Sequence, residues 1–284
     1  MRQPVWKTYK LYIGGKFPRT ESGRYEALRD GDGALVANMS RASRKDFRNA
    51  VVAARAAFAG WSGGTAYLRG QILYRAAEML EGRAAQFVDE LQRQGLSRAE
   101  AQNDVERAGD LLVSYAGWTD KYQALFGSVN PVAGPHFCFS TPEPTGVVGV
   151  LTPPRLGLAP FIEAIAPVIA GGNSCVAIVP IETSLAPISF AEALHTSDLP
   201  GGVVNVLSGH RSELLSHVAS HMDVNAIAVW EADSDERRLA EELGADNLKR
   251  CFFPSFAVER EESVSPALLM RFQETKTTWH PVGT

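Results

Sequence analysis

Apolar residues recur at helical spacing through the first part of the chain. Ser43, a residue type that caps helix starts, precedes Phe47, Val51, Ala54 and Phe58, which lie three or four positions apart and so share one helix face. Three later segments keep this period. The predicted helices are 43–60, 66–80, 83–94 and 99–122. The apolar stripe of the second helix is Leu68, Ile72, Leu73, Ala76 and Leu80. Ahead of them, a Gly-Gly pair within 10–17 predicts a short hairpin at the periphery of the fold.

The second part of the chain alternates short β-branched runs with helical segments. The predicted strands are 137–140, 146–151, 175–179, 203–207, 226–230 and 250–253. The predicted helices are 161–170, 187–195, 213–220 and 235–243. This alternation predicts an α/β protein, with a parallel sheet that carries helices on both faces through right-handed crossovers. Residues 273–280 alternate polar residues with Thr and Trp, which predicts an edge strand that can pair with another subunit.

Composition favours an ordinary globular protein of the cytoplasm. The 284 residues are 45% hydrophobic with a net charge of −4, enough for a sizeable core. The 28 basic and 32 acidic residues are interleaved, so neither nucleic acid nor a membrane surface is an expected partner. Residues 1–10 lack an apolar signal core, and no apolar run reaches the roughly 20 residues that a membrane-spanning helix needs.

Neither the cysteines nor the histidines predict a metal site. Cys138, Cys175 and Cys251 lie far apart in apolar surroundings, as buried thiols of a reducing compartment do. His217 and His221 are four positions apart on one predicted helix, but Val218 stands where the zinc motif HExxH has its glutamate. Packed or solvated histidines are therefore the favoured interpretation.

Six phrases of the sequence, in order, resemble the aldehyde dehydrogenase family. They are LYIGGKF at 11–17, EPTGVVGV at 143–150, APVIAGGNSCVAI at 166–178, LPGGVVNVLSG at 199–209, SHMDVNAIAV at 220–229 and NLKR at 247–250. The chain most resembles the degenerate second module of two-module aldehyde dehydrogenases and short stand-alone proteins of that lineage. Its ending, TKTTWHPVGT, is similar to the terminal strand of that module.

The resemblance implies a Rossmann-like dinucleotide-binding domain with strands for oligomerisation. The domain would comprise 1–129 and 146–267, and the oligomerisation strands would be 130–145 and 268–284. The 34 residues after Arg250 are too few for the family's catalytic domain, so a truncated member of the family is expected.

At the family's cofactor positions the match is partial. Arg155 stands where the family has the asparagine that binds the oxyanion. Val179 stands where the family has the lysine that holds the ribose of the cofactor, whereas Glu182 matches the glutamate that holds the same ribose. Gly209 is the last residue of the phrase LPGGVVNVLSG. We interpret Glu182, Gly209 and Arg155 as vestigial cofactor-binding positions. Residues 230–234 replace the motif that binds the diphosphate with two carboxylates, so no cofactor is expected, although NAD(P) remains possible.

No residue is predicted to be catalytic. Pro254 stands at the position of the family's glutamate base, and no cysteine follows Cys251, whose apolar neighbours would raise its pKa. The favoured hypothesis is a non-catalytic auxiliary or structural subunit. It would assemble through 130–145 and 275–282 with a full-length aldehyde dehydrogenase or with another copy of itself.

Two alternatives stay open at the level of sequence. The chain could support NAD(P)-dependent aldehyde oxidation as one part of a composite enzyme. It could also bind a small anion or a nucleotide with Arg155, His210 and Arg211, although a solvated loop is favoured there. Trp230 and Trp279 fit equally well into a partner surface or into an apolar gap left by the missing catalytic domain.

Overall fold

A five-stranded parallel sheet forms the centre of the protein. The structure is a computed structural model that describes residues 6–256 and 264–283; the parts of the expected domain ranges at 1–5, 257–263 and 284 lie outside the described residues. The strand order is β10-β9-β6-β7-β8. The strands are β6 (Val147–Leu151), β7 (Ser174–Val179), β8 (Val204–Ser208), β9 (Ala226–Val229) and β10 (Arg250–Phe252). The predicted α/β fold with a parallel sheet is confirmed.

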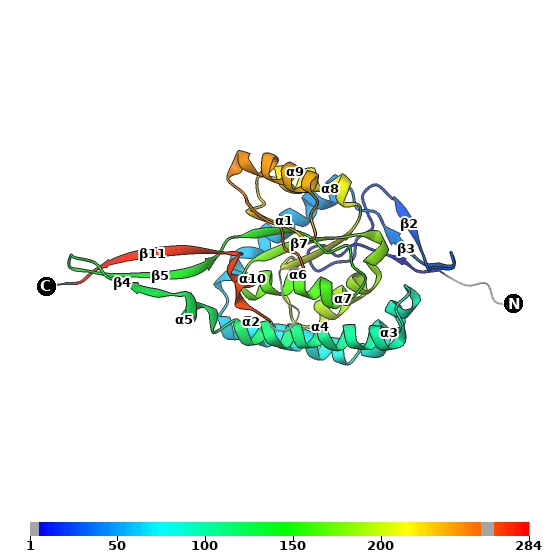
Figure 1. Cartoon of the computed structure of the whole chain (residues 1–284), viewed down its shortest axis with the longest axis horizontal. Helices are drawn as coiled ribbons and strands as arrows, with labels where there is room; N and C mark the ends of the chain where they lie inside the picture. Colours follow the sequence, from blue (N-terminus) through cyan, green and yellow to red (C-terminus); the bar gives the residue numbers. More distant parts are fainter. Residues whose placement is uncertain (1–5, 257–263, 284) are drawn as a thin grey trace.

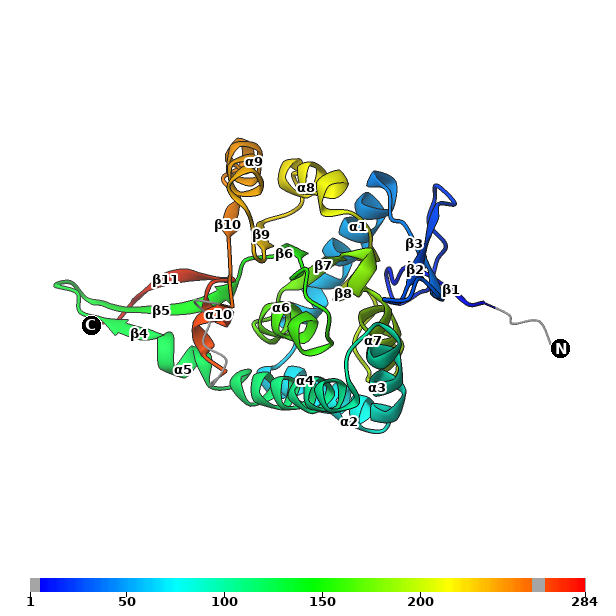
Figure 2. The same cartoon turned by 45° about the vertical axis from the view of Figure 1, so that its right-hand side comes forward.

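Helices cover both faces of this sheet because its strands are apolar on both sides (Figure 2). In β6, Val147 and Leu151 contact one set of helices, and Val148 and Val150 contact the other. The first set is α1 (Arg44–Gly63), α8 (Arg211–Ser220) and α9 (Ser234–Gly244). The second is α6 (Ala159–Ala170) and α7 (Leu185–Thr196), with an outer layer of α2 (Ala66–Glu81), α3 (Ala84–Arg93) and α4 (Arg98–Trp118).

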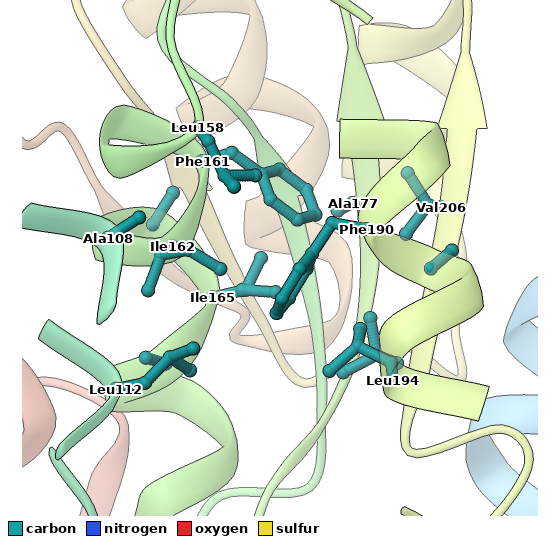
Figure 3. Close-up of a cluster of buried hydrophobic side chains, with 14 of the residues drawn as sticks. Ala108, Leu112, Leu158, Phe161, Ile162, Ile165, Ala177, Phe190, Leu194 and Val206 are labelled. Atoms are coloured by element: carbon teal, nitrogen blue, oxygen red, sulfur yellow. The ribbon is translucent and has the colours of Figure 1, made fainter. Parts of the chain in front are cut away.

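The core beneath α6 and α7 is built from large aliphatic and aromatic side chains (Figure 3). Phe161 and Ile165 of α6 pack against Phe190 and Leu194 of α7, and all four are buried. Each such side chain contributes roughly 1.5–3 kcal/mol when it is fully buried. On the far side of α6, Leu112 of α4 joins the same cluster and ties the outer helix layer to the sheet.

A small sheet near the N-terminus was not predicted. It has the order β1-β3-β2, formed by β1 (Thr8–Tyr9), β2 (Tyr25–Arg29) and β3 (Leu35–Ser40). The Asp30 carboxylate closes the turn between the last two strands because it accepts hydrogen bonds from the N–H groups of Asp32 (3.1 Å) and Ala34 (2.8 Å).

The turn predicted in 10–17 is present, but its expected place at the periphery is wrong. Gly14 and Gly15 take positive φ angles of 59° and 75°, which glycine adopts at little cost, and Ile13 pairs with Lys16. Tyr12 just before them is buried and pairs antiparallel with Val206 of β8. This segment therefore covers the outer edge of β8.

Three details of the predicted helices need correction. The helix expected at 99–122 ends at Trp118, where the Thr119 hydroxyl donates to the Ala116 carbonyl (2.8 Å), and α5 (Tyr122–Phe126) follows as a separate helix. Leu68, assigned to the apolar stripe of α2, is exposed. The short helix α10 (Pro266–Met270) was not predicted.

An antiparallel sheet projects from the body of the molecule (Figure 1). Its order is β11-β5-β4, formed by β4 (Ser128–Asn130), β5 (His136–Pro144) and β11 (Gln273–Pro281). Here called the projecting sheet, it joins strands from 128–144 and 273–281, which lie far apart in the sequence, and β11 takes an edge position, as predicted for 273–280. In the described part of the chain, no helix is both long and apolar enough to cross a membrane.

Candidate functional site

The positions at which the sequence predicts a cofactor or ligand contact follow the carboxyl ends of parallel strands. Arg155 follows β6, Glu182 follows β7, Gly209 follows β8 and Glu231 follows β9. In open α/β sheets this edge is where ligands bind, because the strand ends and the helix starts leave a crevice there. These four positions therefore lie at the same edge of the sheet.

Glu182 and Gly209 lie after neighbouring strands. The Gly209 N–H donates to the Val179 carbonyl (3.0 Å), and a side chain at Gly209 would meet Leu214 of α8 at 3.1 Å. Glu182 lies in a single 3-10 turn with its side chain exposed, and its backbone carbonyl accepts from the Gln94 amide (2.8 Å). Gly209 thus allows α8 to approach the sheet closely.

Arg155 lies beside residues of α4 and α6. It lines a cavity of about 230 Å³ between α4 and α6, and its guanidinium carbon lies 5.2 Å from the centre of the Phe256 ring. Neither Glu182 nor Gly209 is among the described residues that line this cavity. Of the three predicted cofactor positions, Arg155 alone lines this cavity among the described residues.

The wall of the Arg155 cavity is rich in carboxylates. Asp104 accepts the N–H groups of Leu158 (2.5 Å) and Ala159 (3.2 Å), which places its carboxylate at the start of α6, and burial raises its pKa. Glu163 pairs with Arg107 (3.3 Å). Sequence reasoning missed Asp104, whose signal is a carboxylate on the apolar side of α4. Three carboxylates and two guanidinium groups line the cavity, which disfavours the small-anion alternative.

Arg211 is a structural link and is not directed at an empty crevice. Its Nε and Nη2 atoms donate to the two carboxylate oxygens of Glu236 (3.0 and 2.7 Å), a bidentate pair. Its Nη1 donates to the carbonyls of Thr152 (3.3 Å) and Trp230 (2.8 Å). His210 likewise lies 2.9 Å from the Glu26 carboxylate. Arg211 thus ties β6, β9 and α9 together.

Two carboxylates near the start of α9, those of Asp233 and Glu231, accept hydrogen bonds from the chain itself. Asp233 accepts the N–H groups of Asp235 (2.9 Å) and Glu236 (2.8 Å) as the N-cap of the helix. The Glu231 carboxylate accepts from the Phe256 N–H (2.8 Å) and the Ser255 hydroxyl (3.1 Å). These residues stand where the resemblance to the family would place the motif that binds a diphosphate.

The position expected for the family's base carries other chemistry, and so does Cys251, the last cysteine of the sequence. Pro254 is buried, and its carbonyl accepts the Glu231 N–H (2.9 Å). The Cys251 thiol lies 3.5 Å from the Ala240 carbonyl, and burial raises its pKa. Trp230 is buried against Phe256, with ring centres 5.1 Å apart, so it fills a gap in this chain.

The two histidines expected on one helix face do not share a helix. His217 is in α8, whereas His221 follows its last residue in an extended conformation. The His221 ring packs edge-on against Phe47, 5.8 Å between ring centres, and its Nδ1 accepts the Asp223 N–H (3.2 Å). Within residues 6–256 and 264–283, no three His, Cys, Asp or Glu side chains gather as metal ligands would.

Comparison with known proteins identifies the family. The model described as "Aldehyde dehydrogenase family" matches residues 17–253, so the chain belongs to the aldehyde dehydrogenase family. Omega-crystallin of Nototodarus sloanii is 29% identical over 256 residues, which cover 88% of this chain and 51% of that protein. Retinal dehydrogenase 2 of Mus musculus is 31% identical over 250 residues, 86% of this chain and 48% of that protein. The chain spans about half the length of these relatives.

Solved structures agree with this assignment. PnpE from Pseudomonas sp. WBC-3 is 28% identical, with a TM-score of 0.81 over 87% of this chain and 50% of PnpE. The same protein in complex with nicotinamide adenine dinucleotide gives the same identity and TM-score. The expected family and fold are therefore confirmed.

Proposed function

We propose that this chain is a non-catalytic auxiliary or structural subunit that assembles through the projecting sheet. The observation that carries the proposal is the free edge of β11. In the described residues β11 pairs only with β5, over nine residue pairs. Edge strands of this length present backbone groups that can pair with a strand of another subunit.

The register identifies the groups that face outward. The Val282 N–H donates to the Pro135 carbonyl (3.0 Å), so the even-numbered residues of β11 direct their backbone groups at β5. The odd-numbered residues Thr275, Thr277 and Trp279 therefore point theirs away from the sheet. The Gln273 carbonyl obeys this rule, because it accepts from Arg250 (2.6 Å) outside the sheet.

Apolar side chains on the projecting sheet add surface for a partner. Phe137 and Val129, 46% and 68% exposed, share one face of this sheet, whereas Trp279, 59% exposed, pairs with Cys138 and lies on the other face. The rings of Phe137 and Phe139 lie 5.6 Å apart on one face. Large exposed apolar side chains that gather in one place are typical of interaction surfaces. The partner would be a full-length aldehyde dehydrogenase or a second copy of the chain.

The test is a proline scan of the outward positions. Thr277→Pro removes one outward N–H and leaves every bond to β5, so it should shift the assembled protein to monomer in sedimentation velocity. Thr277→Val is the matched control, because it also loses the hydroxyl contact with Ser140 (2.8 Å) but keeps the N–H. A chain that sediments as a monomer, alone and when co-expressed with a full-length aldehyde dehydrogenase of the same source, would overturn the proposal.

A second candidate is a part in NAD(P)-dependent aldehyde oxidation within a composite enzyme. The likeness to PnpE, which has been solved with nicotinamide adenine dinucleotide, supports it. The carboxylates of Glu231 and Asp233 at the start of α9 count against it, because they would repel a diphosphate. Thermal unfolding measured with and without NAD(P) tests this candidate, since a ligand that binds only the folded state must raise the melting temperature.

A further inference from the structure

A long open groove runs between α2 and α4, away from both the crevice and the projecting sheet. It consists of two hollows of about 940 and 730 Å³, which share Tyr74, Glu78 and Val113 and are therefore continuous. Along α2 it extends from Tyr67 to Glu81, so its length approaches the roughly 24 Å of this 16-residue helix.

Glycines give the groove its depth. A methyl group at Gly70 would lie 2.7 Å from the Thr119 hydroxyl and 3.0 Å from the Ala116 carbonyl, so α2 and α4 approach closely there. Gly109 and Gly117 of α4 line the hollows without a side chain to fill them. The two helix backbones thus form the floor, and the side chains beside them form the walls.

The walls are apolar and exposed. Tyr67, Leu68, Tyr74 and Val113 have exposed fractions of 69%, 47%, 52% and 44%. All four line the same hollow. Single exposed apolar residues are common on proteins, but several that line one groove indicate a surface that is covered by something.

The rim of the groove is acidic. Its carboxylates are Glu78, Glu81, Glu106, Asp110, Asp120 and Asp198. The two cations that line it are engaged, since Arg75 pairs with Asp198 and Lys121 donates to the Gly117 carbonyl (2.5 Å). Carboxylates therefore outnumber cations along the apolar walls of the groove, which favours a cationic partner.

We propose that this groove binds an amphipathic helix of a partner protein, with an apolar stripe flanked on both sides by Lys and Arg. An apolar stripe at positions i, i+3, i+4 and i+7 would lie on Tyr67, Leu68, Tyr74 and Val113, as in other cases where a helix docks into a groove between helices. The cationic flanks would lie beside the carboxylates of the rim. This site is independent of assembly through β11.

The probe is a synthetic helical peptide of roughly 18 residues, about five turns, with a leucine stripe and lysine flanks. Fluorescence anisotropy of the labelled peptide against the full chain should show saturable binding that weakens as salt rises. A peptide with glutamates in place of the lysines should bind at least about tenfold more weakly. Tyr74→Ser and the double variant Glu78→Lys with Glu106→Lys should each weaken binding by at least about tenfold.

The matched control is Glu241→Lys with Glu242→Lys on α9, which makes the same charge change on the opposite side of the central sheet (Figure 2). It should bind the peptide like the natural chain. All substituted residues are exposed, and circular dichroism checks that each variant folds. The proposal is overturned if the lysine peptide does not bind, if the groove variants bind it like the control, or if Tyr74→Ser abolishes self-association of the chain, which would make a second copy the occupant.

Discussion

Gly70 of α2 faces Thr119 at the end of α4 so closely that a Cβ atom on Gly70 would lie 2.7 Å from the Thr119 hydroxyl oxygen. Gly70→Ala should therefore lower the free energy of unfolding by about 1–3 kcal/mol, because the overlap outweighs the gain in helix propensity. Gly60→Ala in α1 is the control: nothing lies within 4 Å of its Cβ, so it should raise stability by up to about 1 kcal/mol. Urea unfolding measures both, and equal effects would contradict the close helix contact.

Removal of the Arg211 guanidinium should leave the Glu236 carboxylate and two strand-end carbonyls without their donor. We expect Arg211→Met to lower the free energy of unfolding by about 2–4 kcal/mol, since both members of the pair are largely shielded from solvent. Arg238→Met removes an exposed i,i+4 pair with Glu242 and should change little. Denaturant unfolding of the two variants tests this, and similar losses would show that Arg211 is not a structural link.

The buried ammonium of Lys249 should make stability depend on pH in alkaline solution. It donates to the carbonyls of Val224 (2.7 Å) and His221 (2.9 Å), and burial lowers its pKa to about 8 from the ordinary value of 10.5. Between these two values the unfolded chain binds more protons than the folded chain, so Lys249 makes the free energy of unfolding rise with pH.

The measurement is the difference in stability between the natural chain and Lys249→Met as pH increases. Burial raises the pKa values of Tyr12 and Cys175 to about 12, so these residues make the free energy of unfolding fall with pH. Both residues are present in the two proteins, so the difference removes their contribution. The free energy of unfolding of the natural chain should rise relative to that of Lys249→Met as pH increases from about 8 to 10.5. A difference that does not change with pH would mean that Lys249 keeps an ordinary pKa.

The three thiols should react slowly in the native state. Cys138 and Cys175 are buried away from reagents, and burial raises the pKa of Cys251, so Cys251 carries little thiolate near neutral pH. We expect native Cys251 to react with a chromogenic disulfide at least about tenfold more slowly than the same thiol in denaturant. Mass mapping identifies the labelled residue. Rapid labelling of native Cys251 would revive it as a nucleophile.

The central sheet could be predicted from the sequence because its signals are local. Ser43 and Asp46 form the capping box at the start of α1, and the apolar run 175–179 of β7 is what a strand buried on both faces requires. The strands β2 and β3 were missed, although the turn 30–33 reads Asp-Gly-Asp-Gly, because Glu26 and Arg29 interrupt the apolar pattern of β2 and the sequence of β3, LVANMS, does not alternate.

The arrangement of the candidate site could not be predicted, because it depends on contacts between distant segments. Nothing near Trp230 indicates that Phe256 covers its ring, or that Arg211 reaches Glu236 across the strand ends. His221 was placed on a helix because its spacing from His217 fits one turn. The helix instead ends at Ser220, and the chain turns toward β9.

The pairing of Tyr12 with Val206 bears on how the chain folds. Ser208, at the end of β8, also accepts the Ala42 N–H (2.8 Å), so β8 is bordered by residues separated from it by more than half the sequence. Loops of that length close late, and proteins rich in such distant contacts fold slowly. During synthesis Tyr12 and Ala42 are made before β8, so they can form these contacts only after β8 has emerged.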